Sequence, residues 1–221
     1  MKQILNKIPC QITFAIIGFG SIARKHILSI LSLRPNSVIC ILTSQKIDPD
    51  FSSPNIVYYK SLDQLLVRNP DYYVISSAAN DHRKYLSSLL PYNKKILIEK
   101  PISHTFQEGK KIEQIFTKTK YPPLLGYNLR FSKAFSKILN AIKIEKLGTI
   151  LSVHCVCGQN LNQWRSNREL VHTPSASRSK GGGVLRELSH ELDYLYKFFG
   201  MPHSVSGITS RQFFKNLDVE D

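Results

Sequence analysis

One histidine in this sequence has acids close to it on both sides. It lies in GGGVLRELSHELDYL, residues 181–195, where Glu187 precedes His190 by three residues and Asp193 follows it by three. On one continuous helix both acids would be one turn from the imidazole. Imidazole can accept a hydroxyl proton near neutral pH, and a carboxylate can orient the ring. Glu187 and His190 are therefore candidate catalytic residues and Asp193 a candidate substrate ligand, with a solvent-exposed helix face as the alternative.

A candidate catalytic cation is Lys100, in the tripeptide EKP that ends the apolar run KILIE. The following proline favours extended backbone at Lys100. A lysine after a strand would project its ammonium group from the carboxyl edge of a parallel sheet, where α/β folds bind ligands. The stretch SSAANDH, residues 76–82, follows another predicted strand at that edge. A solvated lysine in a surface turn is the alternative.

Two glycines lie where a strand is predicted to turn into a helix, in FAIIGFGSIARKHI, residues 14–27. In a βαβ unit such glycines let backbone approach a pyrophosphate, and the small Ala23 permits close packing of helix on strand. The first N–H groups of the helix attract the phosphates. The turn predicts a dinucleotide site that includes Gly18, Gly20, Ser21 and Ile22, although the stretch alone also fits a turn that binds nothing.

The end of the second predicted strand distinguishes the two nicotinamide cofactors. A carboxylate there holds the ribose hydroxyls of NAD, whereas its absence near a basic residue favours the 2′-phosphate of NADP. The run is Thr43-Ser44-Gln45-Lys46, with no acid. It favours NADP over NAD, held through Ser44 and Lys46.

The elements that must position these residues alternate between strand and helix. Apolar runs typical of buried parallel strands recur through the first part of the chain: ITFAIIGF, VICILT, NIVYY, YYVIS and KILIE. Alternation with amphipathic segments predicts the α/β class, with a doubly wound parallel sheet of the Rossmann type over residues 1–122.

Residues 123–221 follow a different pattern, which predicts an incomplete α+β domain with an open sheet. TILSVHCVC and SVSGITSRQF, residues 149–157 and 204–213, are predicted strands, and residues 184–199 a single helix. Five residues at helical spacing predict a face of that helix that packs into the core, nearly opposite His190: Leu185, Leu188, Leu192, Leu195 and Phe199.

Composition limits the partners. The net charge is +14, but the lysines are scattered and no nucleic-acid motif occurs, so we expect attraction of phosphorylated small molecules and no nucleic-acid partner. No apolar run approaches the roughly 20 residues of a membrane span. The four cysteines lack metal-ligand spacing, which predicts no metal site and free thiols in a cytoplasmic protein.

Five motifs in this order resemble the glucose–fructose oxidoreductase/inositol dehydrogenase (Gfo/Idh/MocA) family: GFGSIA, SSAANDH, EKP, GYNLRF and GGGVLRELSHELDYL. The resemblance implies a nicotinamide-binding Rossmann domain followed by a substrate domain, and sugars, polyols or nucleotide sugars as substrates. The loops GQNLNQW and SASRSKGGG look like a bacterial branch linked to surface polysaccharides. The family is usually homo-oligomeric.

Carried over residue by residue, the resemblance implies that Lys100 hydrogen-bonds the reacting hydroxyl. It also assigns Lys100 to the cofactor, together with further residues: Ser77, Asn80, His82, Glu99 and Arg130. Lys100 and His190 are also expected at the substrate, with further residues there: Asn128, Trp164, Arg165 and Asp193.

Two departures from the family pattern leave alternatives open. Common members place an acid four residues before the histidine, and by that spacing from Glu187 the histidine's place would fall to Glu191. Members also continue beyond NLDVED, so the chain resembles a carboxyl-terminally truncated member. The two hypotheses are an active oxidoreductase and a cofactor-binding remnant or regulatory module without turnover. The short end also puts the usual homo-oligomer in doubt.

Overall fold

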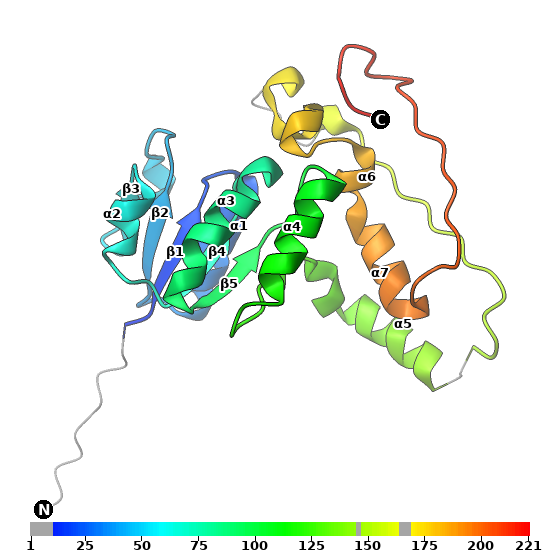
Figure 1. The fold of residues 1–221 in the computed structure, drawn as a ribbon, viewed down its shortest axis with the longest axis horizontal. Coiled ribbons are helices and arrows are strands. Elements are labelled where there is room, and N and C mark those ends of the chain that lie inside the picture. The colour runs from blue at the N-terminus through cyan, green and yellow to red at the C-terminus, as the bar shows by residue number, and fades with distance from the viewer. Residues whose placement is uncertain (1–10, 145–146, 164–168) are drawn as a thin grey trace, which may run out of the picture. The chain divides into compact units, whose positions relative to one another are not determined.

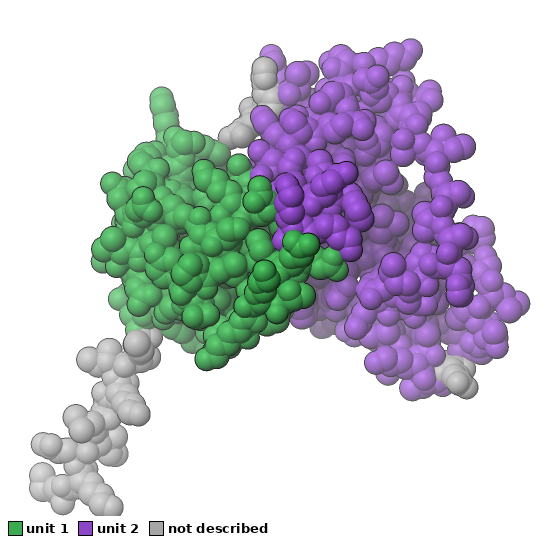
Figure 2. Space-filling view, viewed as in Figure 1, with its two compact units in different colours: residues 1–77, 81–99, 112–124 green, residues 78–80, 100–111, 125–221 purple. Residues whose placement is uncertain are grey.

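The computed structural model describes residues 11–144, 147–163 and 169–221. Contacts within the chain define two compact units, coloured separately in Figure 2. Unit 1 comprises residues 1–77, 81–99 and 112–124, and unit 2 comprises residues 78–80, 100–111 and 125–221. The chain therefore passes from one unit to the other more than once.

Unit 1 is built on a parallel sheet whose strand order reverses beside its first strand. The order is β3-β2-β1-β4-β5-β6, and β1 to β5 pair in parallel (Figure 1). The strands are β1 Thr13–Ile17, β2 Val38–Leu42, β3 Ile56–Tyr59, β4 Tyr72–Ile75, β5 Lys95–Ile98 and β6 Leu124–Leu125. This is the doubly wound order, with β1 and β4 at the switch point where such folds bind ligands. The predicted Rossmann sheet is confirmed.

Three helices of unit 1 pack on this sheet: α1 Ser21–Leu33, α2 Leu62–Leu66 and α3 His82–Leu89. Ala23 and Ile27 of α1 are fully buried and pack in one cluster with strand residues such as Ile16 and Ile41. Because Ala23 carries only a methyl group, α1 can lie close to the strands. The helix that follows the glycine turn is therefore held firmly on the sheet.

Unit 2 is mainly helical among its described residues. Helix α4 (Phe106–Phe116) begins in it, and α5 (Lys133–Lys143), α6 (Val184–Glu187) and α7 (Ser189–Phe199) belong to it entirely. The rings of Phe135 on α5 and Phe198 on α7 lie 4.7 Å apart, so these two helices pack side by side (Figure 1). A second small core contains Ala176, Leu217 and Val219.

The two strands predicted for unit 2 are not formed. Residues 150–160 and 204–211 run as irregular chain without strand pairing (Figure 1). Their apolar side chains stay in solvent: Leu151, Val156 and Ile208 are each more than nine-tenths exposed. Alternating apolar residues favour a strand, but a strand forms only when another backbone supplies its hydrogen bonds. The prediction of strands at these positions is wrong.

The helix predicted over residues 184–199 is interrupted. Leu188, with φ −97° and ψ 28°, separates α6 from α7. The apolar stripe is also not a core face, because Leu185, Leu192 and Phe199 are about half exposed, at 53%, 59% and 45%. The predicted face needed a sheet to cover it, and the two segments expected to supply that sheet form no strand. The predictions of a single helix and of a buried apolar stripe are therefore both wrong.

Three further features of the described residues concern the cysteines, possible metal ligands and the lengths of the helices. Cys40, Cys155 and Cys157 are free thiols. Within residues 11–144, 147–163 and 169–221 no set of three or more His, Cys, Asp or Glu side chains is arranged to hold a metal ion. No helix there is long and apolar enough to cross a membrane.

Candidate active site

The glycine turn after β1 has the geometry that a dinucleotide site requires. Gly18 has φ +100°, and a Cβ there would lie 2.8 Å from the backbone oxygen of Ser76. Gly20 precedes α1 without a side-chain hydrogen bond to cap the helix, and a Cβ on it would meet nothing within 4 Å. The turn therefore leaves open space beside the first N–H groups of α1, where a pyrophosphate binds in this type of fold. Ser21 and Ile22, the next predicted residues, form the start of that helix.

The loop after β4 is fixed by buried polar side chains. Ser76 donates a hydrogen bond from its hydroxyl to the carbonyl of Ile17 at 3.0 Å. His82 is 1% exposed, and its Nε2 lies 3.1 Å from the carbonyl oxygen of Ser77. His82 is thus placed to hold the Ser77 loop, whereas Asn80 is exposed.

Glu99, at the end of β5, has a partner that the sequence did not indicate. Its Oε1 lies 2.6 Å from Nε2 of His26 on α1, and Glu99 is only 7% exposed. The two residues are 73 positions apart in the chain, so no local pattern joins them. His26 therefore fixes the first residue of EKP.

Lys100 and Glu187, both predicted catalytic residues, meet within unit 2. The Lys100 ammonium donates to the backbone carbonyl of Glu187 at 2.8 Å and to its carboxylate at 3.1 Å. Both side chains are largely buried, at 16% and 20% exposed. Two contacts from one residue direct the ammonium group. The sequence suggested Glu187 as a neighbour of His190 on one helix, but the structure uses its carboxylate on Lys100.

His190 lies in the first turn of α7, in a cluster with three other polar or aromatic residues. Its ring packs edge-on against Tyr127, with 5.6 Å between centroids. Arg130 lies over the same tyrosine and forms a two-pronged pair with Asp193, at 2.7 and 2.5 Å. The hydrogen bonds with Asp193 raise the pKa of Arg130 above its usual value. The Arg130–Asp193 pair therefore ties α7 to the segment before α5, next to the histidine.

This pair leads to a stability prediction. Asp193→Asn is expected to lower the free energy of unfolding by about 1–2 kcal/mol, because it removes a charged two-pronged hydrogen bond that solvent partly screens. Urea unfolding of Asp193→Asn, Arg130→Met and the double variant measures it. If the pair stabilises the fold, the sum of the two single losses in unfolding free energy should exceed the loss in the double variant. A sum equal to the loss in the double variant would show that the pair contributes nothing.

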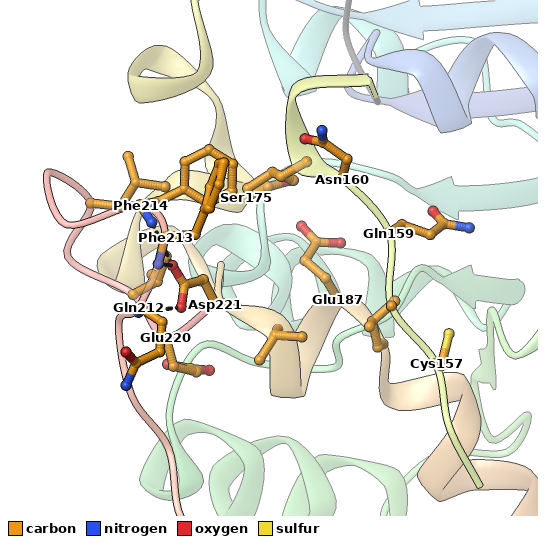
Figure 3. A pocket seen from close by; sticks show the side chains of 17 residues that line it. Cys157, Gln159, Asn160, Ser175, Glu187, Gln212, Phe213, Phe214, Glu220 and Asp221 are labelled. Carbon is orange, nitrogen blue, oxygen red and sulfur yellow. Dashed lines mark hydrogen bonds between the residues drawn. The ribbon is translucent and has the colours of Figure 1, made fainter.

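A cavity of about 530 Å³ opens in unit 2 beside Glu187 (Figure 3). Its walls come from residues 157–161, from α6 and from residues 212–221. The Glu187 carboxylate points into it (Figure 3). On the facing wall the Asp221 carboxylate accepts the backbone N–H groups of residues 212–214 at 2.5–2.8 Å, and these bonds lower the pKa of Asp221. The cavity therefore opens beside the acid that holds Lys100.

The remaining predicted residues are exposed or outside the described chain. Ser44, Lys46 and Asn128 are exposed. Trp164 and Arg165, predicted at the substrate, lie outside the described residues. Glu191, the alternative to the histidine, forms a side-chain hydrogen bond with Cys157, and this bond raises the pKa of that thiol.

Comparison with family models covers almost the whole chain. Residues 12–126 match the model described as an oxidoreductase family with an NAD-binding Rossmann fold. Residues 140–221 match the carboxyl-terminal α/β domain of the same family.

Individual relatives agree with these matches. An uncharacterized oxidoreductase of Schizosaccharomyces pombe is 31% identical over 172 residues, which are 76% of this chain and 45% of the relative. The uncharacterized oxidoreductase YhhX of Escherichia coli is 28% identical over 203 residues, 88% of this chain and 56% of the relative. The chain thus spans about half the length of the curated relatives it matches.

A solved structure shares the fold. The WlbA dehydrogenase from Chromobacterium violaceum, in complex with NADH and UDP-GlcNAcA, aligns with a TM-score of 0.73 at 18% identity. The alignment covers 96% of this chain and 61% of that one. At this identity the likeness concerns the fold alone.

Proposed function

Because the chain belongs to the Gfo/Idh/MocA family of oxidoreductases, we propose that it is an NAD(P)-dependent enzyme acting on a sugar or nucleotide sugar. It moves a hydride between a hydroxyl-bearing carbon and the nicotinamide, in a pathway such as surface polysaccharide synthesis. Residues 1–122 hold the cofactor and residues 123–221 contribute to the substrate site. The free thiols of the described residues agree with a cytoplasmic location.

The residues of unit 1 fit a bound dinucleotide. The open space at Gly20 and the uncapped start of α1 would receive the pyrophosphate. The loop of Ser77, held by His82, and the EKP residue Glu99 would serve the nicotinamide half. Asn80 stays a proposed cofactor residue. A bound nicotinamide accepts or supplies the hydride. Ser44 and Lys46 favour NADP.

The contact of Lys100 with Glu187 carries the catalytic proposal. These residues are 87 positions apart, yet the ammonium group is held by two oxygens of one acid. Lys100 would donate a hydrogen bond to the reacting hydroxyl and stabilise negative charge on its oxygen. His190 would accept the hydroxyl proton as the hydride leaves carbon, and would return it in the reverse reaction.

The proposed substrate site includes residues besides Lys100 and His190. Asp193 is tied to Arg130 beside the histidine, and Asn128 lies in the same segment as Arg130. Trp164 and Arg165 complete the proposed set. A net charge of +14 attracts anionic ligands, which suits a nucleotide sugar better than a neutral sugar. The complex of the WlbA dehydrogenase with UDP-GlcNAcA supports the same class.

A turnover screen tests the proposal. The chain is incubated with NADP⁺ or NAD⁺ and with a panel of UDP-sugars, free sugars and polyols, and nicotinamide absorbance is followed. We expect a signal with at least one UDP-sugar and a weaker one with the matching free sugar. Reduction of cofactor by none of them, despite saturable cofactor binding, would support the second candidate, a cofactor-binding module without turnover. The exposed apolar stripe and irregular segments of unit 2 favour that candidate.

A further inference from the structure

Two cysteines of unit 2 are separated by one residue on an irregular segment. Cys155 and Cys157 are exposed free thiols, and residues 150–160, which contain them, form no strand (Figure 1). Two residues of fully extended chain span about 7 Å, which is close to the longest Cα–Cα distance that a disulfide bridges. Because no strand pairing holds this segment extended, a small bend is enough to bring the two sulfur atoms together.

The sulfur of Cys155 contacts a phenol of α7. Its Sγ lies 2.9 Å from the hydroxyl oxygen of Tyr194. This hydrogen bond, and then burial, raise the pKa of Tyr194 above its ordinary value. Thiols ordinarily lose their proton near pH ~8.5 and phenols near pH ~10, so the phenol is the partner that keeps its proton and donates. A hydrogen bond donated to sulfur stabilises a thiolate, which is the form that attacks an oxidant.

Cys157 has a partner of the opposite kind. Glu191, one helical turn before Tyr194 on α7, forms a side-chain hydrogen bond with Cys157, and this bond raises the pKa of the thiol. A thiol that donates to a carboxylate keeps its proton until a reaction removes it, and the carboxylate is then in place to accept that proton. The two sulfurs therefore differ in chemistry, because one faces a proton donor and the other faces a base.

We propose that Cys155 and Cys157 form a dithiol site that reacts with hydrogen peroxide, with Cys155 as the attacking sulfur and Cys157 as the resolving one. The Cys155 thiolate attacks one peroxide oxygen, the O–O bond breaks, and hydroxide leaves as a sulfenic acid forms. The Cys157 sulfur then attacks the Cys155 sulfur while Glu191 takes its proton and returns it to the departing hydroxide as water. Two thiols are oxidised to one disulfide, and one peroxide is reduced to two waters.

The oxidation changes how the segment is attached to α7, the helix that also carries His190 and Asp193. In the disulfide, Cys155 is no longer a thiolate for Tyr194 to stabilise, and Cys157 has no proton to donate to Glu191. Both of these contacts with α7 are therefore lost. Disulfides that form transiently inside cells are typical of redox sensing. The inference goes beyond the proposed function, because neither chemical step uses the cofactor or the substrate.

Oxidation of the full reduced chain by hydrogen peroxide at neutral pH, followed by mass spectrometry, tests the proposal. Cys155 and Cys157 lie on one tryptic peptide, residues 147–165. We expect this peptide to lose two hydrogens, about 2 Da, with no second peptide attached. The peptide that carries the buried Cys40 should stay unmodified. In Cys157→Ser, dimedone should trap a sulfenic acid at Cys155, whereas in Cys155→Ser it should trap little at Cys157.

Tyr194→Phe tests the phenol hydroxyl alone. It should slow formation of the disulfide about threefold or more, because the donor to the Cys155 thiolate is removed. Tyr196→Phe is the matched control, since it removes the hydroxyl of a half-exposed tyrosine on the same helix, and it should react at the wild-type rate.

Three results would overturn the dithiol site: equal rates for folded Tyr194→Phe and Tyr196→Phe, trapping at Cys157 in preference to Cys155, or a wild-type rate no faster than in urea. If Tyr194→Phe fails to fold, the trapping experiment and the comparison with urea decide. Because the readout is oxidation rather than turnover, a chain that fails the turnover screen can still pass this test.

Discussion

Replacing Lys100 with methionine is expected to lower turnover by a factor of about 100 or more, with NADPH affinity within about threefold of wild type. The ammonium group is the part of EKP that Glu187 holds with two oxygens, and methionine keeps the side-chain length without the charge. Steady-state turnover on the best substrate of the screen, beside NADPH titration, measures the split. His190→Ala should show a loss of the same order.

Two variants sharpen the Lys100 prediction. Lys111→Met is the matched control, because Lys111 is an exposed lysine of α4 that forms an ion pair with Glu108 on the same helix, and we expect near-normal turnover. Glu187→Gln should lose less than Lys100→Met, since the backbone carbonyl of Glu187 still accepts from the ammonium group. Turnover by Lys100→Met close to that of Lys111→Met would remove Lys100 from the mechanism.

We expect Gly18→Ala to reduce stability and Gly20→Ala to reduce dinucleotide binding. Gly18 has φ +100° and its added methyl would lie 2.8 Å from a backbone oxygen, so Gly18→Ala should lower the free energy of unfolding by about 1–3 kcal/mol or more. Gly20 has extended backbone and open space around it. Gly20→Ala should therefore change stability by less than about 1 kcal/mol yet weaken dinucleotide binding, because its methyl would occupy the space proposed for the pyrophosphate.

Urea unfolding and NADPH titration of the two glycine variants separate these effects. Equal stability of the two variants would show that the tight approach of Gly18 to the Ser76 backbone is not needed. Unaltered NADPH binding by a stable Gly20→Ala variant would move the pyrophosphate away from the start of α1.

The Rossmann half could be predicted from sequence because its signals are local. Apolar runs identify the strands, and Gly18 and Gly20 identify the turn. Side-chain caps are equally local: Ser61 accepts from the N–H of Gln64 and Thr105 from that of Glu108. Each signal depends on residues within a few positions of one another, so no knowledge of the rest of the chain is needed.

Unit 2 was harder because its elements depend on distant partners. The segments 149–157 and 204–213 have the alternation of strands, but no other backbone pairs with them in the described chain. The break at Leu188 has no glycine or proline to announce it. The leucine stripe predicted a buried face, although burial requires a covering layer that the sequence pattern does not itself provide.

Sequence also predicted some residues of the candidate site and missed the partners of others. Sequence and resemblance together pointed to Lys100 and Glu187, which the structure brings into contact. They did not predict that His26 would meet Glu99, or that Arg24 would pair with Asp48, because these pairs join residues 73 and 24 positions apart. Long-range pairs of this kind follow from the strand order, which one sequence does not specify.

Titration of the chain with NADPH, followed by calorimetry, tests the central claim most directly. If the open turn at Gly20 and the uncapped start of α1 seat a dinucleotide, heat will saturate at one NADPH per chain, and an excess of 2′-AMP will reduce the apparent affinity. A folded chain that gives no saturable heat with NADPH or NADH would contradict the account.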